Sequence, residues 1–235
     1  MLPHVPLFAD WLFGLTTLLT VWLFYQATRH NCTALLLVIG WMAIHAGLAL
    51  SDFYGKTDTL PPRAALMVAP PLLLLIGMLI TAPGRRFLDS LRLDRLTLLH
   101  VVRVPVEIVL WALYAGPEYV PEVMTFEGRN YDVLSGLTAP VVYYVGYVRK
   151  ALPKAVLLGW NVVCLGLLLN IVIIAILSVP SPFAQFAPNI AVLYFPFVWL
   201  PSVVVPIVML AHVAAIRQLT RRGVAANVPN VATVR

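Results

Sequence analysis

Long apolar runs constrain the fold of this chain more than any other feature. Seven of them, each about 17 to 27 residues long, lie between Val5 and Ile216, and a transmembrane helix needs roughly 20 predominantly apolar residues. Only 11% of the residues are charged, whereas a soluble domain carries roughly 25%. The sequence therefore predicts an all-α integral membrane protein, folded as a seven-transmembrane-helix bundle.

The predicted spans form a single transmembrane domain over residues 1–222. The remaining stretch, residues 223–235, is small and polar and has no helical periodicity, so it is predicted to be a disordered cytoplasmic tail. The spans are Val5–Thr28, Cys32–Ser51, Arg63–Ala82, Arg95–Ala115, Asp132–Val148, Lys154–Ser178 and Ile190–Ile216.

The distribution of charge predicts the orientation of these spans. If the N-terminus lies outside, 12 of the 16 basic residues fall in cytoplasmic segments and six of the ten acidic residues fall outside, as the positive-inside rule requires. The first apolar run has no basic segment before it, so it is predicted to be a retained helix and not a cleaved signal peptide. We therefore expect the N-terminus outside, the C-terminus in the cytoplasm, and a bacterial inner (plasma) membrane as the location.

The net charge of +6 does not point to nucleic acid as a partner. The basic residues lie between apolar spans, where they orient a membrane protein. We expect the lipid bilayer as the environment and a small molecule or a lipid as the ligand. The two cysteines, Cys32 and Cys164, lack the spacing typical of a metal site.

Charged residues inside the fourth span carry the strongest functional signal. Arg103 and Glu107 lie in an apolar stretch where charges are costly. At 100° per residue, His100, Arg103 and Glu107 fall at about 0°, 300° and 340° around a helix, so they share one face. Trp111 and Tyr114 extend this stripe. Because such a face cannot point at lipid, we expect polar groups opposite it.

Depth along the helices groups these residues with others. Glu107 and His45 both lie near the middle of the membrane, whereas His100 and His212 both lie nearer the cytoplasm. The predicted site therefore lies between the second, fourth and seventh spans. Its ligand-binding or proton-linked residues are Arg103, Glu107, His45, His100, Trp111, Tyr114 and Trp199.

Three classes of function fit these residues. In the leading prediction the protein binds a small molecule or transports it together with protons, with Arg103 holding an anionic group and Glu107 carrying the proton. In the second it is a membrane-embedded enzyme acting on a lipid or isoprenoid, with His100, Arg103 and Glu107 as acid–base and charge-stabilising groups. In the third, His100 and His212 bind haem non-covalently. An Arg103–Glu107 pair that only fixes helix packing is a further alternative.

Two loops carry separate predictions. For Thr81–Asp94 we favour an ordinary basic loop over a short interfacial helix, although Phe87, Leu88 and Leu91 have helical spacing. For the acidic stretch Gly116–Asn130, a lid over the bundle and a structural connection fit equally well.

The predicted topology resembles that of microbial rhodopsins, which carry a retinal Schiff-base lysine in their last helix. The lysines here are Lys56, Lys150 and Lys154, none of them in the last span, so a retinal Schiff base is excluded. The topology is also similar to that of the SWEET sugar transporters, but the chain has no internal repeat. Residues 194–199 (Tyr-Phe-Pro-Phe-Val-Trp) resemble the last helix of emopamil-binding proteins, without the paired carboxylates of that family. No family is assigned.

Overall fold

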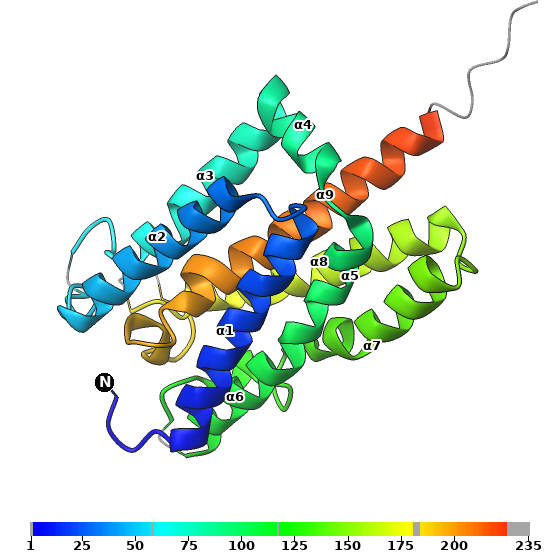
Figure 1. Cartoon of the computed structure of the whole chain (residues 1–235). Helices are drawn as coiled ribbons and strands as arrows, with labels where there is room; N and C mark the ends of the chain where they lie inside the picture. Colours follow the sequence, from blue (N-terminus) through cyan, green and yellow to red (C-terminus); the bar gives the residue numbers. More distant parts are fainter. Residues whose placement is uncertain (1, 58, 117, 181–183, 225–235) are drawn as a thin grey trace, which may run out of the picture.

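The computed structural model describes residues 2–57, 59–116, 118–180 and 184–224, and all regular secondary structure in these ranges is helical (Figure 1). Residues 225–235, most of the predicted disordered tail, lie outside the described residues. Gly223 and Val224, which were also predicted to belong to the tail, form the end of the last helix.

The α-helices are α1 (Leu7–Ala27), α2 (Cys32–Leu50), α3 (Ala65–Ile80), α4 (Ala82–Ser90), α5 (Leu93–Leu99), α6 (Arg103–Ala115), α7 (Val133–Tyr143), α8 (Lys154–Leu177) and α9 (Val205–Val224). Shorter 3₁₀ segments are η1 (His100–Val102), η2 (Glu122–Met124) and η4 (Ala191–Leu193), and π-helical segments are η3 (Tyr144–Val148) and η5 (Leu200–Val204).

Length and apolar composition support the prediction of an all-α membrane protein. Within the described residues, 5 helical stretches are long and apolar enough to cross a membrane, namely Leu7–Ala27, Cys32–Leu50, Leu93–Ala115, Lys154–Leu177 and Leu200–Arg221. Helices α3 and α4 pass the same test only as a pair, and they are bent by 96° at their junction. The helical stretch Val133–Val148 is apolar but shorter.

Helix α9 is the centre of the bundle. It packs against α8, α5, α4 and α3, and Figure 1 shows it in orange, passing between the other helices. Ala211, Ala214 and Ala215 are almost completely buried. Small residues of this kind let helix backbones approach closely in a membrane, where packing replaces the hydrophobic effect between helices.

The helix of the last predicted span begins later than expected and continues beyond its predicted end. It was expected to cover Ile190–Ile216, but the helical stretch begins with η5 at Leu200 and continues to Val224. Proline has no backbone N–H to donate within a helix, and Pro196 and Pro201 interrupt the apolar run on which the prediction was based. Residues 190–199 instead fold into a 3₁₀ turn and further turns before the helix begins.

Prolines also determine how α2 packs on the start of α9. Pro206 cannot donate to the carbonyl oxygen of Ser202, its i−4 position. The indole Nε1 of Trp41 in α2 donates to that oxygen at 3.0 Å instead. In the opposite direction, Nε1 of Trp199 donates to the Met42 carbonyl oxygen at 3.0 Å. Trp41 thus satisfies a carbonyl oxygen that Pro206 leaves without its helical donor, and the Trp199 indole finds an acceptor in an apolar environment.

The preferred prediction of an ordinary basic loop for Thr81–Asp94 is wrong, because residues 82–90 form α4. The Thr81 side chain caps this helix by accepting from the Gly84 N–H at 3.3 Å. Leu88 on its inner face is completely buried. The spacing of apolar residues among arginines was therefore the better guide to this segment.

An ion-pair cluster ties α4 to α9. Both Asp89 carboxylate oxygens accept from Arg217, at 2.9 Å and 3.0 Å, and Arg221 adds a contact of 2.5 Å. Next to it, the Gln218 amide donates to the carbonyl oxygens of Leu88 and Leu91. The paired hydrogen bonds from Arg217 hold the pKa of Asp89 below its ordinary value.

We predict that Asp89→Asn lowers the free energy of unfolding by about 1 kcal/mol at neutral pH, because it removes charge-assisted bonds between two helices. A lowered pKa in the folded state means that this stabilisation is complete above the ordinary carboxyl value of about 4. It is lost as the pH falls through the lowered value. Denaturant unfolding in detergent at neutral and acidic pH measures both effects.

Asp94→Asn is the matched control. Asp94 pairs with Arg92, only two residues away, so this pair connects no separate helices. The control should unfold like the unmodified protein at neutral pH. Equal losses of stability in the two variants would contradict a specific role for Asp89.

Candidate functional site

The charged residues of the fourth predicted span lie on one continuous helical stretch made of α5, η1 and α6. Pro105 lacks the N–H that would bond to the Val101 carbonyl oxygen. Just before it the helix tightens into the 3₁₀ segment η1, where the Arg103 N–H donates to the His100 carbonyl oxygen. His100, Arg103 and Glu107 are each at most 3% exposed, so the predicted polar face points inward.

Arg103 pairs with Asp132 and not with Glu107. Its Nη1 lies 2.7 Å from Asp132 Oδ1, and both side chains are almost fully buried. Gly136 allows α7 to come this close, since a Cβ atom there would lie 2.8 Å from Val104 and 3.2 Å from the Arg103 Cβ. A buried ion pair of this kind is stable only while both partners are present.

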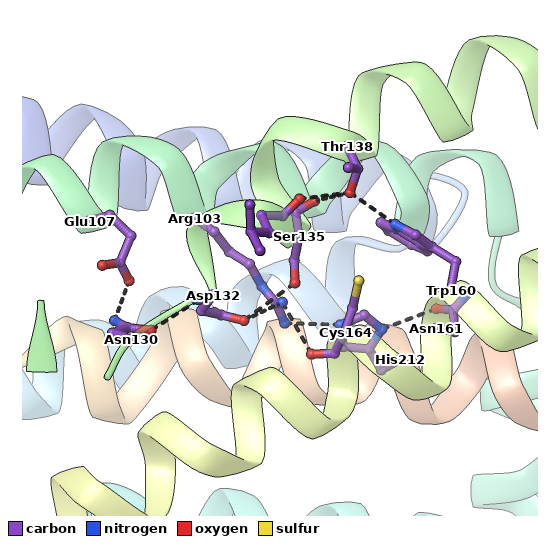
Figure 2. A network of polar contacts seen from close by, with 11 residues as sticks. Arg103, Glu107, Asn130, Asp132, Ser135, Thr138, Trp160, Asn161, Cys164 and His212 are labelled. Atoms are coloured by element: carbon purple, nitrogen blue, oxygen red, sulfur yellow. Dashed lines mark hydrogen bonds and ion pairs between the residues drawn. The ribbon is translucent and has the colours of Figure 1, made fainter. Parts of the chain in front are cut away.

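The second Nη atom of Arg103 contacts His212 in α9 at 2.9 Å (Figure 2). A guanidinium can only donate, so His212 Nε2 must be the acceptor. The other ring nitrogen, Nδ1, then carries the hydrogen and donates to Asn161 Oδ1 at 3.0 Å. The Asn161 amide in turn donates to the Leu157 carbonyl oxygen. His212 is therefore neutral, with its hydrogen on Nδ1 and its lone pair on Nε2 facing Arg103.

His100 lies face to face with His212, with ring centroids 3.9 Å apart and an angle of 13° between the rings. The two histidines were predicted to lie at the same depth in the membrane, and in the structure they are in direct contact. The contact does not fit a haem, because the stacked rings leave no room for a macrocycle and both His212 nitrogens already have partners.

Glu107 has a different partner, Asn130, whose amide nitrogen donates to Glu107 Oε1 and to the Met124 carbonyl oxygen. The Asn130 side-chain oxygen accepts from the Asp132 backbone N–H at 3.1 Å. Figure 2 shows the resulting row of side chains, with Glu107 at one end, Arg103 in the middle and His212 towards the other end. Glu107 Oε2 has no hydrogen-bond partner among the described residues.

With both carboxyl groups ionised and His212 neutral, this network carries one more negative than positive charge. Arg103 supplies one positive charge and Asp132 one negative charge, and His212 is neutral. Glu107 is a second carboxyl group without a cationic partner in the network. An uncompensated buried charge is costly. An ionised Glu107 would therefore need a further positive charge nearby, whereas a protonated Glu107 would not.

The stretch Gly116–Asn130 packs into the bundle. The sequence had allowed two predictions for it, a lid over the bundle and a structural connection. Met124, Thr125 and Asn130 are at most 2% exposed. At one end of the stretch, the Tyr119 carbonyl oxygen accepts from the backbone of Ile190. Asn130 at its end is the partner of Glu107, and Asp132, two residues further on, is the partner of Arg103. This segment therefore completes the network.

Two of the predicted site residues lie apart from the network. Trp111 is 37% exposed, and its Nε1 donates to Glu127 at 2.9 Å. Tyr114 is half-buried and packs at the edge of the core. Both residues keep the angular position of the stripe, but they lie 8 and 11 residues beyond Arg103. At about 1.5 Å per residue they are roughly 12 and 16 Å further along the helix axis, past the end of the network.

His45 and Trp199 belong to a second cluster, between α2 and the start of α9. His45 is fully buried, and its Nδ1 lies 2.6 Å from the Tyr54 hydroxyl. Trp41 packs edge-on against its ring, with centroids 4.3 Å apart. Trp199 packs against the same group of buried residues. The predicted site therefore divides in two, and its charged part is built by α6, α7, α8 and α9.

The sequence analysis did not include Asp132, Asn130 or Asn161 in the site. Asp132 was counted among the acidic residues outside the membrane, although it is the first residue of the predicted fifth span. A buried arginine needs a carboxylate, and Asp132 at the end of a span could have been considered as one. For Asn130 and Asn161 the sequence carries no signal that separates them from ordinary loop and helix amides.

Comparisons of the chain with protein-family models, with curated proteins and with solved structures find no match. The site is therefore interpreted from its own geometry.

We predict that Asp132→Asn destabilises the protein by about 3 kcal/mol, because it leaves the buried Arg103 guanidinium without its carboxylate. Denaturant unfolding in detergent measures the loss. The double variant Arg103→Met, Asp132→Asn should be more stable than Asp132→Asn, since it removes both charges. A single variant as stable as the unmodified protein would show that the pair does not hold α6 to α7.

Proposed function

We propose that this chain is a membrane protein that binds a small molecule or transports it together with protons, with Glu107 as the proton carrier. The observation that carries the proposal is the imbalance of the buried network, in which Glu107 lacks a cationic partner. Ionisable groups within membranes mark ion pathways and proton relays. A carboxyl group beside a fixed Arg–Asp pair gains or loses a proton without breaking that pair.

The proposal includes a topology. We propose seven spans, in which α3 and the shorter stretch α7–η3 join the five long helices. The N-terminus then lies outside and the arginine-rich α4 and the end of α9 lie at the cytoplasmic surface of a bacterial inner (plasma) membrane. The loop before α7, which is proposed to lie outside, is acidic, whereas α4 and the end of α9, which are proposed to lie in the cytoplasm, are basic. This distribution of charge supports the orientation.

Arg103 is the group proposed to hold an anionic part of the solute. Asp132 already occupies one side of its guanidinium, while Arg103 Nε has no hydrogen-bond partner among the described residues. Nε is therefore the donor left for a bound carboxylate while Asp132 stays on Nη1. The segment that covers Glu107 also lines a surface hollow of about 460 Å³, bordered by Glu122, Arg129 and Phe186, which gives a solute a place to approach from the outer side.

Infrared difference spectroscopy of the protein in lipid vesicles tests the proton carrier. Lowering the pH should produce a carboxylic-acid carbonyl band that Glu107→Gln abolishes while the helical content is unchanged. The matched control is Glu118→Gln, which removes an exposed carboxylate and should keep the band. A band that persists in Glu107→Gln, or no titrating buried carboxyl at all, would overturn the proposal.

We further predict that Glu107→Gln loses pH-dependent uptake. Vesicles with an entrapped pH-sensitive dye report proton movement when small carboxylates, amines or neutral solutes are added outside. The solute that acidifies the vesicles with the unmodified protein should have no such effect with Glu107→Gln. Unchanged uptake in this variant would contradict a role for Glu107 in transport.

A further inference from the structure

A second pair of opposite charges lies at the end of the bundle that is proposed to face outside. Glu122 and Arg129 both line the surface hollow of about 460 Å³, and Phe186 lines it with them. The volume of this hollow is within the range of about 300 to 1,000 Å³ that small-molecule sites occupy. The proposed function uses the hollow only as a place of approach and assigns no ligand to its charged groups.

The chain brings Glu122 and Arg129 to the same hollow, although they lie seven positions apart in the sequence. The Arg129 N–H donates to the Val123 carbonyl oxygen at 3.2 Å and so closes the loop between them. Gly128 permits this closure, since a Cβ atom there would lie 2.7 Å from the Val123 Cα atom. The Asn170 amide of α8 then donates to the Arg129 carbonyl oxygen at 2.9 Å. Both charged side chains are therefore carried by a backbone that hydrogen bonds hold in place.

Neither charge is neutralised by a partner within the protein. Both side chains are exposed, and no ion pair among the described residues includes Glu122 or Arg129. The Tyr114 hydroxyl is a hydrogen-bonding neighbour of the Glu122 carboxylate, but it carries no charge. Arg129 is the only basic residue of the acidic stretch 116–130. The hollow therefore presents one cationic and one anionic group that do not pair with each other.

We infer that the hollow binds a small zwitterion of the α-amino acid type, with its carboxylate on Arg129 and its ammonium group on Glu122. This inference rests on the proposed function, for which it names the class of solute. A guanidinium can donate two parallel hydrogen bonds to a carboxylate, and an ammonium group donates to a carboxylate oxygen. Apolar residues complete the lining, among them Pro121, Val123 and Phe186, and they fit an apolar side chain on the solute.

The buried network offers the same two kinds of group. Arg103 Nε and Glu107 Oε2 are buried and have no hydrogen-bond partner among the described residues. A zwitterion that reaches the network thus finds a donor for its carboxylate and an acceptor for its ammonium group. The segment that lines the hollow also touches the network, because the Asn130 amide donates to Glu107 and to the Met124 carbonyl oxygen. One class of solute therefore fits both places.

Net charge distinguishes a zwitterion from a simple anion or a simple cation. With Glu107 protonated, Arg103 and Asp132 balance each other and the buried network is neutral. A simple carboxylate would add an unbalanced negative charge to this apolar surrounding, and a simple amine would add an unbalanced positive one. Either charge is costly there. A zwitterion adds no net charge, so its entry leaves the balance of the network unchanged.

Saturation-transfer NMR of the protein in lipid nanodiscs tests the inference, with leucine as the probe. Two analogues separate its charged ends, since isocaproate lacks only the amino group and isoamylamine lacks only the carboxylate. Leucine should bind, and each analogue should bind at least about tenfold more weakly, because it loses one hydrogen-bonded contact between charged groups. Empty nanodiscs correct for ligand that enters the lipid.

Variants show whether the binding takes place in the hollow. Glu122→Gln and Arg129→Gln should each weaken leucine binding about tenfold, because each removes one of the two charges. Arg129→Lys retains the cation and should weaken binding less than Arg129→Gln. Lys56→Gln is the matched control, since it removes an exposed cation from another loop and should leave binding unchanged.

Several outcomes would overturn the inference. Equal binding of leucine and one of its analogues would show a site for a simple anion or a simple cation. Absence of leucine binding, or equal binding to the unmodified protein and to Glu122→Gln and Arg129→Gln, would also contradict it. The Glu107 infrared band is measured separately, so a titrating band without leucine binding removes this inference and leaves the proton carrier. Leucine binding without a titrating band supports the zwitterion site and removes the proton carrier.

Discussion

The ion pair between Arg103 and Asp132 is the contact on which the buried polar part of this protein depends. It joins α6 to the start of α7, and through the second Nη atom of Arg103 it also orients His212 on the central helix α9. His212 then bonds to Asn161 on α8. Four helices are thus connected by one guanidinium, which is possible because its donors diverge in a rigid plane.

Close packing of the helices allows the Arg103–Asp132 pair and its neighbours to meet. Gly136 lets α7 approach the Arg103 position closely, and the small residues of α9 admit its neighbours on several sides. Where Pro206 removes a helical hydrogen bond, a side chain from another helix replaces it, because Trp41 donates to the Ser202 carbonyl oxygen. The backbone can therefore be irregular at this point without leaving that oxygen unpaired in an apolar surrounding.

Hydropathy and charge were enough to predict the helical membrane fold and the inward direction of Arg103 and Glu107, because both follow from the cost of exposing polar groups to lipid. The partner of Arg103 was not predictable in this way. Asp132 is 29 residues away in sequence, and only the packing of α7 on α6 brings it close. The start of the last helix was missed because residues 190–199 are apolar, although they form turns.

Stability alone does not account for the network. Replacing a buried ion pair by apolar side chains of similar size is often neutral or stabilising, and the surrounding helices already pack through large apolar cores. A structural role would also be complete with Arg103 and Asp132 alone. Glu107 adds a buried carboxyl group that this pair does not need, and His100 adds a buried imidazole without a hydrogen bond among the described residues. Glu107 and His100 are therefore buried titratable groups that the Arg103–Asp132 pair does not account for.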